Sequence, residues 1–205
     1  ANAIDTSKFC FNESIRNSIR KTLNIEDSTI VIGNVARFNF QKNHTFMIDA
    51  FTTFVTKYPD SKLLLLGEGE LLGEIKNKTS ALGIGDKVIF AGAVGNANEY
   101  LNAMDVFLFP SVFEGLGIVA IEAQTNGLSV VMNHTLPREL DVTPLIYRLS
   151  LTSPLVDWAE AIWNKGSNKI DRTGWQSMVI DKGYDVQENV RFLTSFYQRI
   201  TMGSN

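Results

Sequence analysis

Basic and acidic side chains follow two apolar runs of this sequence, and the basic ones could bind a phosphorylated ligand. Arg37 and Lys42 come after the run that ends at Gly33. Glu114 and Glu122 come after a later run and have seven residues between them. The guanidinium fork of Arg37 and the compact charge of Lys42 could hold a diphosphate without a metal. The two carboxylates could serve two parts of one elongated ligand.

The turn between the two glutamates also favours an anion. Gly115 and Gly117 allow the backbone to approach a ligand closely at the start of a helix, and the free N–H groups of the first helical turn favour negative charge. Glu122 lies about five residues into this helix, which offsets it from Glu114 by roughly 7 Å along the axis. An acid near a helix N-terminus, a solvated glutamate and ordinary surface cations would give the same spacing. Spacing alone therefore leaves both interpretations open.

The pattern of apolar and polar residues predicts the elements that would position these groups. Short β-branched runs alternate with segments of helical period, which is typical of a parallel sheet with right-handed crossovers and helices on both faces. We predict one α/β domain over residues 1–205, a doubly wound parallel sheet of about six strands. In such sheets, ligands bind at the carboxyl ends of the strands. We expect strands at Thr29–Gly33, Lys62–Leu66, Lys87–Ala91, Asp105–Phe109, Leu128–Met132 and Pro144–Arg148, and helices at Glu13–Leu23, Thr45–Lys57, Glu70–Leu82, Ala97–Met104, Gly117–Gln124, Pro154–Asn164 and Asp185–Arg199.

A third glycine-containing turn, Gly67-Glu68-Gly69, nearly matches a dinucleotide fingerprint. Glu68 and Glu70 would repel a pyrophosphate at this turn. The end of the next strand, Phe90 to Gly92, lacks the acidic residue that would hold a ribose. We therefore rank a dinucleotide oxidoreductase as the least favoured interpretation.

The composition excludes several other classes. The 205 residues include 44% hydrophobic and 20% charged residues, which is typical of a globular protein. The net charge of −3 argues against nucleic-acid binding, which needs clustered lysine and arginine. His44 and His134 stand alone as surface or loop histidines, without a second ligand at zinc spacing, so we expect no metal. Cys10 is the only cysteine, which favours a reducing compartment.

The sequence also bears on membranes and on completeness. The most apolar region, Met104–Ala123, is interrupted by charged residues and a proline, so we expect no membrane span. We see no signal peptide and expect a cytoplasmic location. The chain begins at Ala1 without methionine, and we interpret it as a piece of a longer protein.

An ordered set of motifs makes the sequence similar to a known family. It resembles the C-terminal, nucleotide-sugar-binding domain of the family-four, or group 1, retaining glycosyltransferases. The resemblance implies a Rossmann-like domain that forms the C-terminal half of a GT-B fold, with the acceptor-binding N-terminal domain absent from this chain. It runs from Asn2 to about Val131. The markers are the strand at Gly33, Arg37 and Lys42, the Gly67-Glu68-Gly69 turn, Val88-Ile89-Phe90-Ala91-Gly92, Ala103-Met104-Asp105-Val106, and the pair Glu114 and Glu122.

The resemblance implies a role for each of these residues. Arg37 and Lys42 would hold the donor diphosphate and stabilise the leaving group, aided by the backbone N–H groups of Leu116 and Gly117. Glu114 would contact the donor sugar, and Glu122 the ribose. No metal or other cofactor is implied. The implied catalytic residues are Glu114, Arg37 and Lys42, and the implied donor-binding residues are Gly33, Arg37, Lys42, Gly67, Gly69, Phe90, Gly92, Glu114, Gly115, Leu116, Gly117 and Glu122.

The function that the resemblance implies is transfer of a sugar from a nucleotide sugar, with UDP as the default nucleotide, to a glycan or lipid-linked acceptor in capsular polysaccharide or exopolysaccharide biosynthesis. The acceptor would be held by the missing domain, so we expect the isolated chain to bind donor without turnover. The full-length protein could associate peripherally with the inner face of the membrane. A nucleotide-sugar epimerase half-domain of the same fold and a non-catalytic nucleotide-binding module remain open as alternatives.

Overall fold

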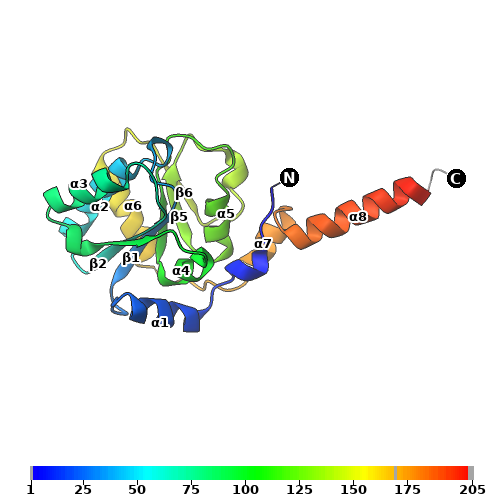
Figure 1. The fold of residues 1–205 in the computed structure, drawn as a ribbon, viewed down its shortest axis with the longest axis horizontal. Helices are drawn as coiled ribbons and strands as arrows, with labels where there is room; N and C mark the ends of the chain where they lie inside the picture. Colours follow the sequence, from blue (N-terminus) through cyan, green and yellow to red (C-terminus); the bar gives the residue numbers. More distant parts are fainter. Residues whose placement is uncertain (1, 169, 203–205) are drawn as a thin grey trace.

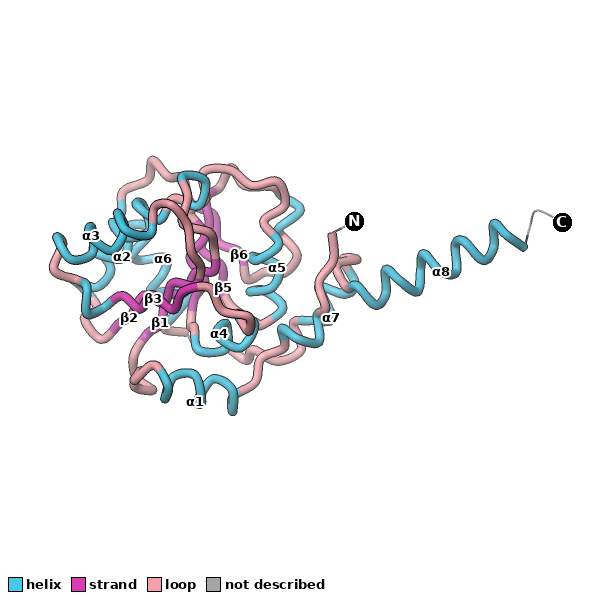
Figure 2. The backbone as a smooth tube through the Cα atoms, viewed as in Figure 1, coloured by secondary structure: helices cyan, strands magenta, loops and turns pink. Residues whose placement is uncertain are grey.

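Six parallel strands form one sheet in the computed structural model, which describes residues 2–168 and 170–202. The strand order is β3-β2-β1-β4-β5-β6, so the chain runs outward from β1 to one edge, returns to pair β4 with β1, and continues to the other edge (Figure 2). This is the predicted doubly wound topology, and it confirms the fold class. The strands are β1 Ile30–Val35, β2 Ser61–Leu66, β3 Val88–Gly92, β4 Val106–Phe109, β5 Ser129–Asn133 and β6 Ile146–Leu149.

Helices cover both faces of the sheet (Figure 1). One face packs against α2, α3 and α6, and the other packs against α4 and α5, while α1 lies against α4 and α7 lies against α5. Short 3₁₀ segments lie at Thr6–Phe9, Phe40–Lys42, Gly85–Lys87 and Arg138–Leu140. The helices are α1 Glu13–Thr22, α2 His44–Lys57, α3 Leu72–Ala81, α4 Ala97–Ala103, α5 Ile118–Thr125, α6 Leu155–Gly166, α7 Gln176–Asp181 and α8 Val186–Met202.

Alternate residues of each central strand enter opposite hydrophobic clusters, because successive side chains of a strand point to opposite faces. In β4, Phe107 and Phe109 pack with α4 and α5, whereas Val106 and Leu108 pack with α2 and α6. All four side chains are fully buried. A strand buried on both faces must read as a continuous apolar run, which is why the sequence predicted this sheet well.

The structure differs from the prediction in a few boundaries. Strand β1 continues past Gly33 because Asn34 is accommodated inside the sheet, where its side-chain amide donates to the carbonyl of Leu108 at 2.8 Å. Helix α3 begins only at Leu72, since the backbone N–H of Leu71 donates to the carbonyl of Phe38 instead. Helix α7, at Gln176–Asp181, lies between Asn164 and Asp185, where the sequence predicted only a weak helical pattern without bounds, because six residues give little periodicity.

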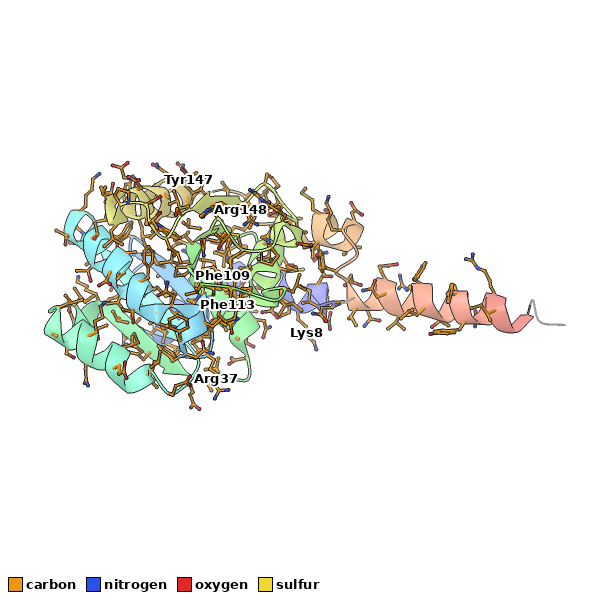
Figure 3. All side chains as sticks on the ribbon, turned by 90° about the horizontal axis from the view of Figure 1, so that it is seen from above. Lys8, Arg37, Phe109, Phe113, Tyr147 and Arg148 are labelled. Atoms are coloured by element: carbon orange, nitrogen blue, oxygen red, sulfur yellow. The ribbon has the colours of Figure 1, made fainter. Side chains whose placement is uncertain are left out.

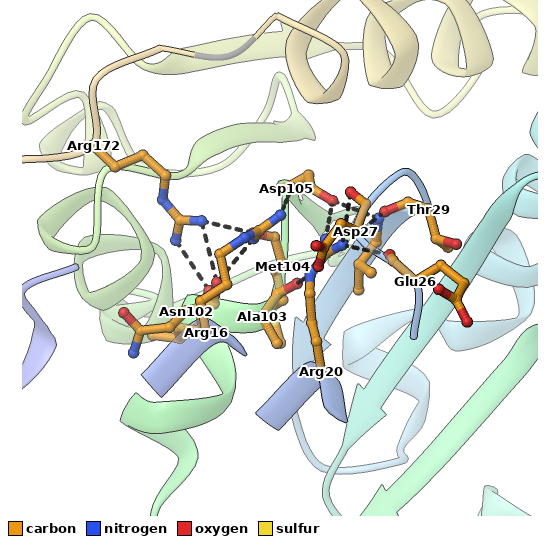
Figure 4. Close-up of polar contacts among 12 residues, drawn as sticks. Arg16, Arg20, Glu26, Asp27, Thr29, Asn102, Ala103, Met104, Asp105 and Arg172 are labelled. Carbon is orange, nitrogen blue, oxygen red and sulfur yellow. Dashed lines mark hydrogen bonds and ion pairs between the residues drawn. The ribbon is translucent and has the colours of Figure 1, made fainter. Parts of the chain in front are cut away.

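A buried charge network lies at the amino edge of the sheet, opposite the carboxyl ends of the strands (Figure 4). Asp105 accepts from Arg16 at 2.6 Å and from Arg20 at 2.5 Å, and one of its oxygens also accepts from the backbone N–H of Val31 at 2.8 Å. Burial lowers the pKa of Arg20, and Asp105 opposes that shift. Arg172 donates to backbone carbonyls at the end of α4. The network therefore ties α1, β1 and β4 together.

Helix α8 projects from the body of the fold (Figure 1). It starts beside the N-terminal segment, where Ile4 forms a parallel bridge with Asp185. Its apolar side chains are largely in solvent, with Phe192 69% exposed. In the part of the chain that the structure describes, α8 included, we find no helix with the length and apolarity to cross a membrane.

Candidate functional site

Two loops at the carboxyl ends of the adjacent strands β1 and β4 meet and carry the basic and acidic residues predicted from the sequence. The backbone N–H of Val112 donates to the carbonyl of Gln41 at 2.8 Å. The side-chain amide of Asn43 donates to the carbonyl of Pro110 at 3.2 Å. These bonds join the loop after β1 to the loop after β4, so the fold brings together residues more than 60 positions apart in sequence.

Lys42 and Glu114 form an ion pair where these loops meet. The Nζ atom of Lys42 lies 2.6 Å from Oε1 of Glu114, and the side chains are 19% and 5% exposed. The other carboxylate oxygen of Glu114 accepts from Nε2 of Gln41 at 3.2 Å. The same Nε2 donates to the carbonyl of Phe113 at 3.0 Å. Sequence reasoning missed Gln41, because a glutamine has no charge to distinguish it from an ordinary loop residue.

The backbone conformation around Lys42 determines where its side chain points. The residue ends the 3₁₀ turn Phe40–Lys42, and the side chain of Asn39 caps this turn by accepting from the backbone N–H of Lys42 at 3.2 Å. Asn43 follows in the left-handed conformation, with φ 55°, which asparagine tolerates better than most residues. Lys42 also lies over the ring of Phe109, 5.7 Å from its centroid. The ammonium group is therefore held above the end of β4.

Arg37 lies on the same loop but does not join the ion pair. Its side chain is 73% exposed, and its Nε atom lies 3.8 Å from Glu70 (Figure 3). The loop beneath it rests on the glycine turn after β2, where Phe38 donates its backbone N–H to the carbonyl of Glu68 at 2.9 Å. Arg37 is thus free to reorient toward an anion, whereas Lys42 is already engaged.

Some glycines of the predicted donor site lie at the carboxyl edge of the sheet, and one lies inside a strand. Gly67, at φ 131°, has no room for a Cβ, which would lie 2.1 Å from the carbonyl oxygen of Ala36. Its N–H donates to the carbonyl of Gly92, so these two strand ends lie side by side at the carboxyl edge. Gly69 packs in the same way against Phe38. Gly33 does not reach the site: it lies inside β1, and Met104 fills the space that its Cβ would take.

Phe90, another predicted donor-binding residue, is half-buried in β3 with the Lys76 ammonium 5.4 Å from its ring centroid. It also lies 6.2 Å from the ring of Phe38, centroid to centroid. This places Phe90 at the β3 end of the same edge. No contact joins it to the ion pair, so its position fits a ligand that extends along the edge of the sheet.

Helix α5 begins beside Glu114. Gly117 precedes its first residue at φ 75°, and a Cβ there would lie 3.1 Å from the ring of Phe109. Gly115 is exposed and Leu116 is half-buried in the preceding turn. The first turn of a helix leaves backbone N–H groups without intrahelical partners, and these favour an anion. The turn therefore presents its backbone close to the Lys42–Glu114 pair.

Glu122 lies one turn further along α5 and is half-buried. Burial raises the pKa of its carboxyl group, and no charged neighbour contributes to that shift. A half-buried carboxylate without a compensating cation is costly unless a ligand donates hydrogen bonds to it. Glu122 is therefore suited to accept from hydroxyl groups of a ligand bound along α5.

His44 corrects one expectation from the sequence. It begins α2 and is 1% exposed rather than at the surface, with its ring stacked on Phe38 at a centroid distance of 4.0 Å. Burial, with the nearby charge of Lys42, lowers its pKa to about 4, so the imidazole is neutral at pH 7. Within the described residues, no group of three or more histidine, cysteine, aspartate or glutamate side chains could hold a metal ion.

A cavity of about 510 Å³ lies at the opposite, amino edge of the sheet. Its walls include Arg16, Asp105 and Arg172, which are engaged in the buried charge network. It is therefore separate from the candidate site, which lies at the carboxyl edge.

A doubly wound sheet with cationic side chains, a helix N-terminus and a carboxylate at its carboxyl edge defines an α/β domain suited to a phosphorylated ligand. Residues 15–140 match the family described as glycosyl transferases group 1. The chain therefore belongs to the group 1 glycosyltransferases, as its motifs indicated, and its family is one of sugar-transferring enzymes.

Related proteins are similar over different lengths. EpsF of Bacillus subtilis, named as a glycosyltransferase, is 31% identical over 198 residues, which are 96% of this chain and 52% of EpsF. The Vi polysaccharide biosynthesis protein VipC/TviE of Salmonella typhi is 34% identical over 110 residues, which are 54% of this chain and 19% of that protein. The chain thus spans about half of EpsF and a fifth of VipC/TviE.

Solved structures share the fold. Anabaena HepE in complex with UDP and glucose superposes with a TM-score of 0.74 at 19% identity, covering 95% of this chain and 55% of HepE. Sucrose-phosphate synthase from Thermosynechococcus elongatus gives a TM-score of 0.77 at 20% identity, covering 99% of this chain and 52% of that enzyme. Both likenesses confirm the Rossmann-like architecture of a GT-B half.

Proposed function

We propose that this chain is the donor-binding half of a retaining glycosyltransferase that uses a UDP-linked hexose in polysaccharide biosynthesis. The observation that carries the proposal is the meeting of Lys42 and Glu114 beside the N-terminus of α5, at the edge where doubly wound folds bind ligands. UDP as the nucleotide is supported by the solved complex of HepE with UDP and glucose. Polysaccharide biosynthesis is supported by the name of VipC/TviE.

The donor diphosphate would lie between Lys42 and the first turn of α5, with Arg37 swinging in from solvent. A helix N-terminus alone contributes about 0.3–1 kcal/mol to binding an exposed anion, which is little for a diphosphate. Two cationic side chains add the larger part and need no metal. Because they also stabilise the charge that develops as the sugar–phosphate bond breaks, they would assist the departure of the nucleoside diphosphate.

The two glutamates would bind different parts of the donor. Glu114 lies beside the diphosphate position and would accept from hydroxyl groups of the sugar. Glu122 lies further along α5 and would accept from the ribose hydroxyls. Their different surroundings argue against a glycosidase-like acid and base pair, because one carboxylate is ion-paired and the other faces no cation.

The acceptor would be a glycan or a lipid-linked sugar held by the part of the enzyme that this chain lacks, at the membrane face in the full-length protein. The chain alone would therefore bind donor without turnover. Cys10 is a free thiol, which fits a cytoplasmic location.

Calorimetric titration of this chain with UDP, with GDP and NAD as controls, tests the proposal. We expect UDP to bind, Lys42→Met and Glu122→Ala to weaken it at least tenfold, and the exposed control Glu139→Gln to leave it unchanged. Binding of GDP but not of UDP would show that the nucleotide is GDP rather than UDP and would leave the site assignment standing. Equal binding by wild type and both variants would overturn the site assignment.

A further inference from the structure

Gln41 makes three contacts that connect both loops of the site. Its backbone carbonyl accepts from Val112 at 2.8 Å. Its Nε2 atom donates to the carbonyl of Phe113 at 3.0 Å and to Oε2 of Glu114 at 3.2 Å. The two oxygens of the Glu114 carboxylate are thus divided between the neighbouring residues Gln41 and Lys42.

We propose that Gln41 is a positioning residue of the donor site: it anchors one oxygen of Glu114, so that Lys42 can release the other oxygen and bind the donor diphosphate. This inference rests on the proposed function and adds to it a residue that no motif of the sequence indicates.

The reason lies in the competition for Lys42. Its ammonium is 2.6 Å from the Glu114 carboxylate, whose side chain is 5% exposed. An arriving diphosphate must draw the ammonium away from this carboxylate, and a nearly buried carboxylate that loses its donors is strongly penalised. Gln41 offers a neutral donor that stays in place when Lys42 turns to the ligand. Because an amide carries no charge, the diphosphate does not compete for it as it does for a cation.

The position of Gln41 suits this role. Lys42 and Gln41 belong to the same 3₁₀ turn, so the mobile donor and the fixed donor approach Glu114 from one element. The backbone bond to Val112 fixes where the Gln41 side chain starts. Its second acceptor, the carbonyl of Phe113, adjoins Glu114 in the chain, so the amide holds the residue before Glu114 as well as its carboxylate.

Two substitutions should then change diphosphate affinity in opposite directions. Gln41→Met keeps the length of the side chain and the backbone contact but removes the donor, so Glu114 depends on Lys42 alone and retains it. A hydrogen bond of ordinary strength corresponds to a loss of roughly threefold to tenfold in affinity. Glu114→Gln frees Lys42 and should raise affinity for a diphosphate about tenfold. In the Glu114→Gln background, Gln41→Met should have no further effect.

The experiment is a calorimetric titration of this chain with inorganic pyrophosphate and with UDP, on wild type, both single variants and the double variant. Gln187→Met, on the exposed side of α8, is the matched control and should match wild type. The expected result is the pair of opposite changes and their coupling. A loss from Gln41→Met that is equally large in the Glu114→Gln background would overturn the proposal, because Gln41 would then act only on the loop structure.

A second measurement needs no ligand. In the NMR spectrum of the free chain, the side-chain amide protons of Gln41 should shift when Glu114 is changed to Gln, since they lose a charged acceptor. They should keep their wild-type position when pyrophosphate saturates the chain. An unchanged resonance in Glu114→Gln would refute the bond and the proposal with it. If the chain bound pyrophosphate but not UDP, the proposed function would be overturned and this inference would stand.

Discussion

Loss of the Lys42 charge should destabilise the ligand-free chain, because it leaves the Glu114 carboxylate nearly buried without its cation. Breaking a fully buried ion pair from one side costs about 3–5 kcal/mol. Lys42 is 19% exposed and Glu114 keeps the hydrogen bond from Gln41, so we expect a smaller cost of about 2–3 kcal/mol for Lys42→Met. For a domain of this size, that corresponds to a decrease in Tm of about 5–10 °C.

Thermal unfolding followed by circular dichroism at pH 7 measures this cost. The double variant Lys42→Met with Glu114→Gln should recover most of the lost stability, because no unpaired buried charge remains. Lys57→Met is the control, since Lys57 forms an exposed pair with Glu160 at 3.8 Å and should change Tm by less than about 2 °C. A Tm of Lys42→Met within that same range, or a double variant less stable than either single variant, would refute the reasoning.

Three further predictions concern other parts of the chain. Burial raises the pKa of Glu122, so the folded state loses stability as the pH rises through the pKa of the unfolded chain and the carboxyl group ionises. Glu122→Gln should therefore raise Tm at pH 7 while it weakens UDP binding. Wild-type affinity for UDP should fall as the pH is lowered through the raised pKa. Thermal melts and titrations from pH 4 to pH 8 check both, and a Tm below that of wild type would contradict the first. Asp105→Asn should lower Tm by about 10 °C, since it leaves buried arginines without their counter-charge, yet leave UDP affinity unchanged, which melting and calorimetry measure together. Gly67→Ala should lower both Tm and UDP affinity, because its Cβ would lie 2.1 Å from the carbonyl oxygen of Ala36 under the Arg37 loop. Gly73→Ala, where the space is open, should lower neither. Equal Tm and affinity changes in the two variants would contradict this prediction.

The fold could be predicted from the sequence because its strands are buried on both faces. Runs such as Val106–Phe109 must be apolar throughout, and they stand out between helical periods. The predicted strand boundaries were wrong where a polar side chain forms a hydrogen bond with a distant segment, as Asn34 does inside β1. The short α7 could be predicted only as a weak helical pattern without bounds, because six residues carry little periodicity.

The candidate site could be predicted in part. Lys42 and Glu114 were predicted because charged residues at strand ends converge at one edge of a parallel sheet, and the structure brings them together. Gly33 was predicted as a donor-site glycine, and the structure places it inside β1, where Met104 fills the space that its Cβ would take. Gln41 and the burial of His44 depend on contacts between distant segments, which a single sequence does not reveal.

A crystal structure of this chain with bound UDP would show directly which side chains hold the nucleotide. We expect the diphosphate within hydrogen-bond distance of Nζ of Lys42 and of the first turn of α5, with the ribose hydroxyls donating to the Glu122 carboxylate. We also expect Gln41 still to donate to Glu114 in this complex. UDP found at the amino-edge cavity beside Arg16 and Arg172, with the Lys42–Glu114 pair unchanged, would contradict the proposed donor site.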